Sequence, residues 1–190
     1  LPLVMYSIQH IWPQLSDMLD TNVEYYQEGN LRLGSTPQHQ KILEGLADRA
    51  AACGVDVRMI LIKNPAGCNQ VLNYLTQLSE PFTFVACLND RAQDGKDVSW
   101  IWDVDFERLC EMGDTLREIY VSGVRADDMA LRFAYAGFPT NRIHVVKDYK
   151  ALCEQSASHK LPVYMMPTYT AMLALRQTIS KTYGYKNFWE

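Results

Sequence analysis

Short apolar runs and amphipathic stretches alternate along the chain from Val55 onward. Runs rich in β-branched and aromatic residues predict strands, and apolar residues three and four positions apart predict helices. We expect strands over 55–62, 82–88, 118–121, 142–146 and 162–165, and helices over 68–78, 106–112, 125–136, 150–157 and 168–182. Strands that alternate with helices of this length are typical of βαβ units. The pattern therefore predicts an α/β fold, a Rossmann-like three-layer sandwich around a mainly parallel sheet.

The pattern is less regular before residue 55. Residues 4–19 have helical spacing, and Pro37 is well placed to open a second helix that we expect to run to Cys53. We therefore expect an N-terminal helical segment over 1–54 and an α/β domain over 55–190. The N-terminal segment could supply the first helix of the same sheet or form a separate lobe.

The segment 97–107 has the most unusual composition in the chain, because two tryptophans and several acids occur within eleven residues. An extended strand turns alternate side chains to opposite faces. As a strand, the segment would place Trp100, Trp102, Val104 and Phe106 on one face and Ile101, Asp103 and Asp105 on the other. The first face would be anchored in a core. The second would present acids at the carboxyl end of the strand, where open α/β sheets place their sites.

The two acids of this segment have different structural alternatives. Asp105 directly precedes an expected helix and is placed to cap its N-terminus. Asp103 is then the freer carboxylate, and it could orient a histidine as the acid of a nucleophile–histidine–acid triad does. A surface or backbone-capping role is the alternative for Asp103.

A complete triad within the chain is not expected. No G-x-S-x-G nucleophile elbow occurs. His144 alternates inside an expected strand, which indicates a paired residue of the sheet. Asp127 and Asp128 fall in the first turn of an expected helix, where acids complement the helix dipole.

Charge and motifs exclude several function classes. The formal net charge of −4 argues against a nucleic-acid-binding surface, which usually needs a basic patch. Neither G-x-x-x-x-G-K-[ST] nor G-x-G-x-x-G occurs, so we expect no nucleotide cofactor bound by this chain. The loop Asn64–Gly67 lies between a strand and a helix, and backbone N–H groups at such a helix start can bind anions. A tight turn stiffened by Pro65 is the alternative.

The cysteines and the apolar runs bear on the cellular compartment. The five cysteines are odd in number and form no C-x-x-C pair, so we expect reduced thiols and no metal site. No apolar run approaches the roughly 20 residues that span a membrane. The first residues lack the basic stretch of a signal peptide. These features predict a cytoplasmic protein without a transmembrane segment.

Five strings of residues occur together in an order that resembles one family. They are LIKNPAGCNQVL at 61–72, LND at 88–90, DGKDVSWIWDVDFE at 94–107, SGVRADDMALRFAYAG at 122–137 and PTYTAML at 167–173. In this order they resemble the C-terminal domain of MurT-like proteins, the Mur-ligase-like subunits of lipid II isoglutaminyl synthase. The resemblance covers roughly residues 59–182, and it implies the fold of Mur ligase C-terminal domains.

The resemblance also implies a partner and a reaction. MurT-like proteins pair with GatD, a glutaminase subunit that carries the nucleophilic cysteine and the histidine. The complex uses ATP, Mg²⁺ and glutamine to amidate the D-glutamate of lipid II during peptidoglycan synthesis. By this resemblance the domain docks the glutaminase and supplies its triad acid, which matches Asp103, with Asp105 as the fallback. The loop with Asn64, Pro65 and Gly67 would lie near the nucleotide and the acceptor.

The chain departs from the family pattern in what precedes this domain. Family members carry an upstream Mur-ligase central domain with an ATP site, and usually a cysteine zinc ribbon, and neither is found in the sequence. We therefore expect a C-terminal domain or a divergent relative that is inactive by itself. The alternative function is a stand-alone Rossmann-like binding module without a catalytic role.

Overall fold

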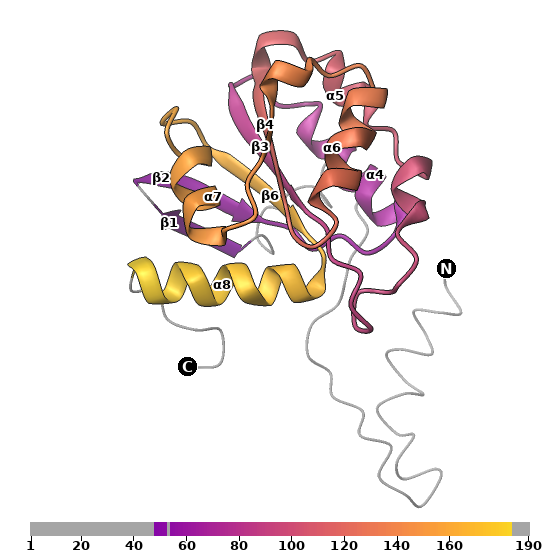
Figure 1. Ribbon diagram of the computed structural model, residues 1–190. Helices are drawn as coiled ribbons and strands as arrows, with labels where there is room; N and C mark the ends of the chain where they lie inside the picture. Colours follow the sequence, from indigo (N-terminus) through magenta and orange to yellow (C-terminus); the bar gives the residue numbers. More distant parts are fainter. Residues whose placement is uncertain (1–47, 53, 184–190) are drawn as a thin grey trace, which may run out of the picture. The chain divides into compact units, whose positions relative to one another are not determined.

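A six-stranded β-sheet forms the centre of the described part of the chain, which comprises residues 48–52 and 54–183 of the computed structural model (Figure 1). The strands lie in the order β1-β2-β6-β3-β4-β5. Their bounds are Asp48–Ala52 (β1), Val55–Met59 (β2), Phe82–Cys87 (β3), Leu116–Ser122 (β4), Ile143–Val145 (β5) and Val163–Pro167 (β6). β1 is antiparallel to β2, and all the other neighbouring pairs are parallel. The prediction of an α/β fold with a mainly parallel sheet is confirmed.

Helices cover both faces of this sheet, which confirms the three-layer sandwich (Figure 1). The α-helices are Pro65–Leu75 (α4), Glu107–Cys110 (α5), Ala126–Tyr135 (α6), Tyr149–Ser156 (α7) and Tyr169–Tyr183 (α8), and the 3₁₀ helices are Ser99–Asp103 (η3), Gly113–Thr115 (η4) and Thr140–Arg142 (η5). α4, α5 and α6 bury residues such as Leu72 and Phe133 against one face. α7 and α8 bury Leu152 and Leu175 against the other.

The two central strands explain why the sheet could be recognised from the sequence. All six residues of β3 and all five of β6 are buried. A parallel strand with helices over both faces has no solvent side, so its sequence is a continuous apolar run. Such runs predicted both strands.

The strand β1 contradicts the expected helix that was to run to Cys53. Asp48 pairs with Met59 and Ala52 pairs with Val55, so the two strands form a hairpin. Gly54, with φ of +74°, lies in the turn of this hairpin, where the sequence pattern predicted the end of a helix. Pairing with the open edge of β2 outweighs the helical propensity of an alanine-rich stretch. The sheet therefore begins before the boundary expected at residue 55, and residues 1–47 and 53 lie outside the described residues.

The segment 97–107 is the second correction, because it forms η3 and the start of α5 rather than a strand. Ile101, Val104 and Phe106 are almost completely buried, whereas Trp102 is 48% exposed. β3 already has β6 and β4 on its two sides, so no edge is available at the centre of the sheet. The segment instead packs against α4 and α6. The strand was predicted because the aromatic residues of this segment alternate with a period of two, which is also the period of a strand.

Gly123 provides a test of how closely the loops after β3 and β4 approach each other. Its φ is +93°, and a Cβ atom at this position would lie 2.4 Å from the carbonyl oxygen of Leu88. We expect Gly123→Ala to lower the free energy of unfolding by about 2–4 kcal/mol, because both backbone strain and a clash arise. Urea denaturation of both proteins measures this difference.

Gly95→Ala is the matched control for this substitution. Gly95 has φ of +94°, but no atom lies within 4 Å of the place that a Cβ atom would take, so only the conformational strain remains. We expect a loss of about 1 kcal/mol. Equal losses at the two positions would show that the approach of Leu88 to Gly123 is not tight.

Candidate functional site

A network of hydrogen bonds around Asn89 joins the loops that follow β3, β4 and β6, at the carboxyl edge where the parallel strands end. The Asn89 side chain accepts from the Val124 N–H (2.9 Å) and donates to the Thr170 hydroxyl (2.8 Å). Its backbone N–H donates to the Thr168 hydroxyl (3.0 Å). Asp94 accepts from the Thr170 N–H (2.7 Å) and from its hydroxyl (2.5 Å). Neither Asn89 nor Asp94 was predicted as a site residue, although both lie in strings that carry the resemblance.

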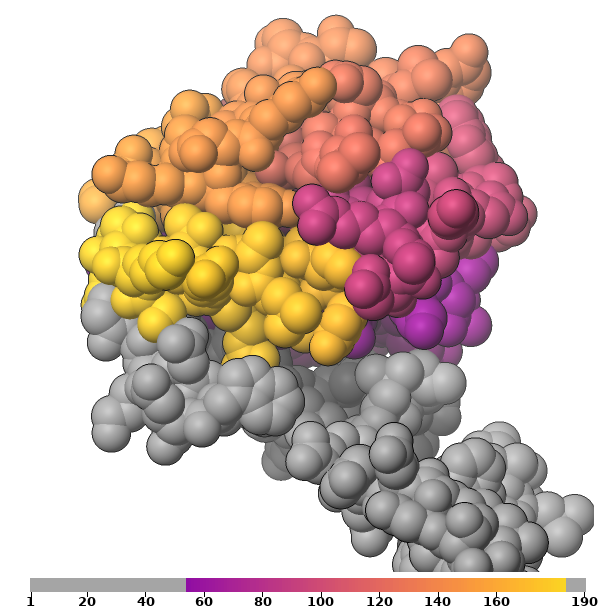
Figure 2. Space-filling view, turned by 60° about the horizontal axis from the view of Figure 1, so that its bottom comes forward, coloured from indigo at the N-terminus to yellow at the C-terminus, as the bar shows by residue number. Residues whose placement is uncertain are grey.

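The network lies at a place where this fold class offers a crevice to ligands. In open α/β sheets that crevice lies where neighbouring strands send their connections to opposite faces, and β3 and β6 are one such pair, because α5 packs on one face and α8 on the other. Asn89 is 5% exposed and Asp94 is 6% exposed, and their polar atoms are bonded within the chain. Figure 2 shows the loop after β3 lying against the start of α8 on this side of the molecule. These side chains therefore fix the loops in place.

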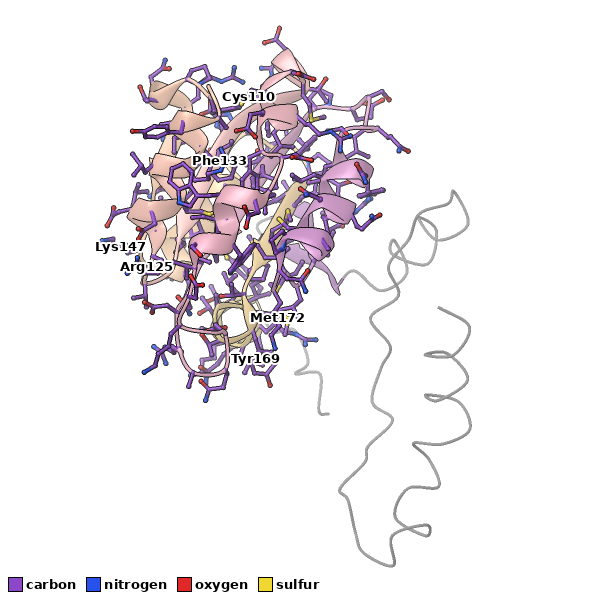
Figure 3. The ribbon with its side chains drawn as sticks, turned by 90° about the vertical axis from the view of Figure 1, so that its right-hand side faces the viewer. Cys110, Arg125, Phe133, Lys147, Tyr169 and Met172 are labelled. Atoms are coloured by element: carbon purple, nitrogen blue, oxygen red, sulfur yellow. The ribbon has the colours of Figure 1, made fainter. Side chains whose placement is uncertain are left out.

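A pocket of about 280 Å³ lies beside the network, at the ends of β3, β4 and β5. It is lined by Asn89, Arg91, Gly123, Val124, Lys147, Tyr149, Thr170 and Ala174. The Lys147 amino group pairs with the Asp127 carboxylate at 2.9 Å. Burial raises the pKa of Tyr149 to about 12, so its phenol stays protonated at neutral pH. Arg125, Lys147, Tyr169 and Met172 lie at this end of the domain, and Cys110 lies towards the opposite end (Figure 3).

The loop Asn64–Gly67 lies at the same edge. Ile60 and Ile62 donate to carbonyls of Met165 and Pro167, which extends the pairing of β2 with β6 up to this loop. The Asn64 side chain caps α4 by accepting from the Gly67 N–H at 2.8 Å. Pro65 has no N–H, and the Gly67 N–H already donates to Asn64. Two of the first N–H positions of the helix are therefore not available to bind an anion. The loop therefore fits a capped turn better than a phosphate cradle. Its proximity to a nucleotide stays a prediction.

η3 is attached to α6 by the buried guanidinium of Arg132. Its Nε donates to the Ile101 carbonyl (3.1 Å) and an Nη donates to the Val104 carbonyl (2.7 Å). The Glu107 carboxylate pairs with both Nη atoms at 2.9 Å. This hydrogen bond with Arg132 is the largest cause that lowers the pKa of Glu107. Arg132 was not identified from the sequence, because its partners are 25 to 31 residues away.

Asp103 and Asp105 lie on the outer side of this segment, over the helical layer rather than at the end of a strand. Both residues are exposed. Within the described residues neither carboxylate forms a hydrogen bond or an ion pair, and the Asp105 backbone N–H donates to the Asn69 side chain at 2.9 Å. Asp105 does not cap α5: Phe106 is the capping residue and makes no side-chain bond. The expected cap is therefore wrong, since α5 starts from a 3₁₀ turn.

Trp102, the residue before Asp103, belongs to a group of exposed apolar side chains. Trp102 is 48% exposed, Tyr135 is 73% exposed and Leu131 is 51% exposed. The rings of Trp102 and Tyr135 meet edge to face at 5.5 Å, and Leu131 lies one helical turn before Tyr135 on α6. We call Trp102, Leu131 and Tyr135 the aromatic patch. Large exposed apolar side chains that gather in this way are typical of interaction surfaces.

The other candidate chemical groups have structural roles. Burial raises the pKa of the Cys68 and Cys87 thiols, so neither is an activated nucleophile. His144 lies 2.7 Å from Glu118 and stacks on Tyr120, which confirms the expected paired sheet residue. Among the described residues, no group of three or more His, Cys, Asp or Glu side chains could hold a metal ion. In the same part of the chain, every helix is too short or too polar to cross a membrane.

Comparisons with known proteins match most of the described domain. A family model described as MurT ligase C-terminal matches residues 61–172. Lipid II isoglutaminyl synthase (glutamine-hydrolyzing) subunit MurT of Streptococcus pneumoniae is 35% identical over 126 residues, which cover 64% of this chain and 27% of that protein. The subunit of the same name from Staphylococcus aureus is 34% identical over 123 residues, which cover 65% of this chain and 28% of that protein. The chain thus spans between 27% and 28% of the length of these relatives.

One solved structure supports the fold alone. Folylpolyglutamate synthase from Mycobacterium tuberculosis, complexed with ADP, superposes with a TM-score of 0.51 at 15% sequence identity. The superposition covers 71% of this chain and 32% of that one.

The pairing of Glu107 with Arg132 predicts a pH dependence. The pKa of Glu107 is lowered from its ordinary value of 4.5, so the ionised form stabilises the folded state above that pH. This stabilisation is lost as the pH falls below about 4.5 towards the lowered pKa. We expect wild type to be more stable than Glu107→Gln at about pH 6, and the difference to shrink towards about pH 3. Thermal unfolding of both proteins across this range measures it; a constant difference would contradict the assigned pair.

Proposed function

The chain belongs to the MurT ligase C-terminal family, and we propose that it is the glutaminase-docking domain of a glutamine-dependent amidoligase. The two curated relatives are named as the MurT subunit of lipid II isoglutaminyl synthase (glutamine-hydrolyzing), and this supports the same reaction for the assembled synthase here. In this proposal the assembled synthase uses ATP, Mg²⁺ and glutamine to amidate the D-glutamate of lipid II in peptidoglycan synthesis. The chain pairs with a GatD-like glutaminase subunit.

The observation that carries the proposal is the free carboxylate of Asp103 on a firmly held, exposed turn. The buried cation that binds the carbonyls on either side of Asp103, Arg132, is already neutralised by Glu107. Among the described residues no side chain pairs with the Asp103 carboxylate, so its charge is available to a group on another protein. We assign Asp103 as the acid that completes the triad of the partner glutaminase. Asp105 is the fallback.

The proposed reaction divides the triad between two proteins. The partner's cysteine thiolate attacks the carboxamide carbon of glutamine, and the partner's histidine gives its proton to the departing ammonia. Water then hydrolyses the thioester to glutamate and frees the cysteine. The Asp103 carboxylate accepts the other N–H of the histidine, holds the ring in the reactive tautomer and stabilises the imidazolium. The chain contributes this orientation and charge, and the partner contributes the nucleophile.

The aromatic patch beside Asp103 is the proposed docking surface. An acid can act on a partner's histidine only if the two proteins are held in one geometry. Exposed aromatic side chains supply such anchors, because they bury a large area with few rotatable bonds. Trp102 precedes Asp103 directly, and Tyr135 contacts Trp102. Docking on this patch would therefore bring the partner's active site to the acid.

We propose that the chain itself holds neither ATP nor Mg²⁺. The Asn64–Gly67 loop uses its side-chain acceptor on its own helix, and its proline lacks a donor. The acids at the carboxyl edge are bonded within the chain, as Asp94 is to Thr170. ATP chemistry then belongs to the rest of the assembled synthase.

We expect Asp103→Asn to lower the glutaminase kcat of the assembled complex by about 100-fold or more. The amide cannot stabilise the imidazolium, and for a serine protease the same change costs about 10⁴-fold. The loss is smaller here because a cysteine is intrinsically more nucleophilic. Ammonia-dependent amidation by the assembled synthase should survive, because it bypasses glutamine hydrolysis. Glutamate release and lipid II amidation are measured side by side.

Asp105→Asn is the matched control, since it removes a neighbouring exposed charge and leaves the fold intact. We expect glutaminase activity to change by less than about threefold. If Asp105→Asn loses glutaminase activity and Asp103→Asn keeps it, Asp105 is the triad acid. Full activity in both variants would favour the alternative, a Rossmann-like binding module without a catalytic role.

Docking is tested by Tyr135→Ala. We expect the affinity for the glutaminase subunit to fall by about tenfold or more, because an aromatic anchor is lost. Tyr169→Ala is the control: Tyr169 is also an exposed tyrosine (41%), but it lies on α8 at the carboxyl edge. Calorimetric titration with the glutaminase subunit measures both affinities. If Tyr135→Ala binds the glutaminase subunit as tightly as Tyr169→Ala, the aromatic patch is not part of the interface.

The chain alone should neither hydrolyse ATP nor release ammonia from glutamine. Its buried thiols Cys68 and Cys87 have raised pKa values, and His144 is engaged by Glu118. Ammonia release by the purified chain, abolished by substitution of one of its own cysteines, would contradict the proposed division of the triad.

A further inference from the structure

We propose that the pocket beside Asn89 binds a carboxylate of the peptide substrate, with Arg91 as the cation and Tyr149 as an uncharged donor. This contact rests on the proposed function, in which the assembled synthase acts on a peptide, and it gives the chain a direct part in holding that peptide. The bound carboxylate is one that the reaction leaves unchanged, because a peptide whose internal glutamate is amidated still has a carboxylate at its end. The contact does not depend on which residue serves as the triad acid.

The pocket differs in charge from the chain as a whole. The chain has a formal net charge of −4, whereas the described residues that line the pocket include two cations, Arg91 and Lys147, and no acid. Two acids lie close to this lining, and both are engaged. Asp127 pairs with Lys147 at 2.9 Å, and Asp94 accepts from the N–H and the hydroxyl of Thr170. The guanidinium of Arg91 therefore remains as the uncompensated charge of the pocket.

Arg91 extends from a loop whose backbone is held in place. Its carbonyl accepts from the N–H groups of Asp94 (2.9 Å) and Gly95 (3.0 Å), and its own N–H donates to the Asp94 carboxylate (3.3 Å). Among the described residues its guanidinium makes no hydrogen bond or ion pair, and the preceding acid, Asp90, lies 3.7 Å from Arg125. A guanidinium is a planar fork of donors that matches the two oxygens of a carboxylate. Arg91 is therefore available to bind one.

Tyr149 supplies a donor without adding a charge. Burial raises the pKa of its phenol to about 12, so the hydroxyl keeps its proton at neutral pH. A hydrogen bond with the Asn89 side chain and the charge of Arg91 both act in the lowering direction on this pKa, so both groups lie close to the phenol oxygen. A hydrogen bond lowers the pKa of a phenol when it is donated to the oxygen. The proton of Tyr149 is thus left for a ligand that also contacts Arg91.

The charge and the size of the pocket favour a carboxylate over a phosphate. One guanidinium balances the single charge of a carboxylate, whereas a phosphate group carries about −1.5 to −2 at neutral pH. The nearby carboxylates of Asp94 and Asp127 would repel the additional negative charge. The volume of about 280 Å³ also leaves space beyond the anion, and Val124 and Ala174 contribute apolar side chains to the lining. A carboxylate on a small apolar residue fits both properties.

The location of the pocket suits a substrate contact. It lies at the carboxyl ends of β3, β4 and β5, the edge at which open α/β sheets bind ligands, and Lys147 lies at this end of the domain (Figure 3). Val124 lies just before the start of α6, whereas Tyr135 of the aromatic patch ends that helix. A ten-residue helix is about 15 Å long. A glutaminase anchored at Tyr135 and a peptide in the pocket therefore approach different ends of α6.

Binding to the purified chain is tested by NMR titration with N-acetyl-D-alanyl-D-alanine, its C-terminal amide and inorganic phosphate. We expect the free acid to shift the amide signals of Gly123 and Val124, and the amide and phosphate to bind at least about tenfold more weakly. Arg91→Met should weaken binding of the acid by about tenfold or more, and Tyr149→Phe by about threefold or more, because each loses one donor group. Lys96→Met is the matched control, since Lys96 is an exposed cation of the same loop that does not line the pocket.

The contact with the substrate is tested in the assembled synthase with ammonia in place of glutamine, so that the glutaminase has no part in the result. We expect Arg91→Met to raise KM for lipid II by about tenfold and Tyr149→Phe by about threefold. kcat should stay within about twofold in both, because the carboxylate contact is the same before and during the reaction. Lys96→Met should leave both constants within about twofold of wild type.

Each part of the proposal has a result that overturns it. Binding of the amide or of phosphate as tight as that of the acid would exclude a carboxylate site, and no shift with any probe would exclude the pocket as a site. Equal weakening by Lys96→Met and Arg91→Met would show a general attraction of charge instead of a contact in the pocket.

The two experiments also separate this proposal from the proposed function. If the chain binds the acid but Arg91→Met leaves KM for lipid II unchanged, the contact with the substrate is wrong. If the wild-type synthase amidates no lipid II with either nitrogen source, the proposed function fails, and the titration alone decides whether the pocket binds a carboxylate.

Discussion

The ion pair between the buried Arg132 and the exposed Glu107 is the interaction on which the candidate site depends. A guanidinium that is 4% exposed is stable only because a carboxylate and two carbonyls satisfy it. In return it ties a short 3₁₀ turn to a well-packed helix. Because Glu107 neutralises the cation, the nearby Asp103 keeps an uncompensated charge at the surface. One ion pair thus holds the turn in place and leaves the Asp103 carboxylate without a partner among the described residues.

The fold was predictable where local signals agree with tertiary structure. β3 and β6 are buried on both faces, so their sequences are continuous apolar runs, and the helix expected over 125–136 is observed as α6, which ends before Gly137 with its φ of +94°. β1 was missed because its only reason to be a strand is the open edge of β2, which no local pattern reveals. The strand expected over 97–107 failed because alternating aromatic residues have the same period as a strand, whereas packing on α4 and α6 required a turn.

The candidate site was predictable only in part for a similar reason. The resemblance pointed to Asp103, but the sequence pattern predicted that it lies at the end of a strand. It lies instead in the 3₁₀ helix η3. Arg132 was invisible in the sequence because its role is defined by partners 25 to 31 residues away and by the burial of its charge. Asn89 and Asp94 likewise acquire their roles only when three loops meet at one edge. Long-range polar contacts leave no periodic trace in a sequence.

The bonding around Asn89 has a consequence for which residues can replace it. Its carbonyl oxygen accepts from a backbone N–H while its amide nitrogen donates to a threonine hydroxyl. That hydroxyl in turn gives its own proton to Asp94. Aspartate has the same shape as asparagine but carries no proton to donate, and its second negative charge would lie beside Asp94. Asparagine is therefore required at this position because the hydrogen bonds need one acceptor and one donor on the same side chain. Asparagine and aspartate do not differ enough in size for packing to distinguish them.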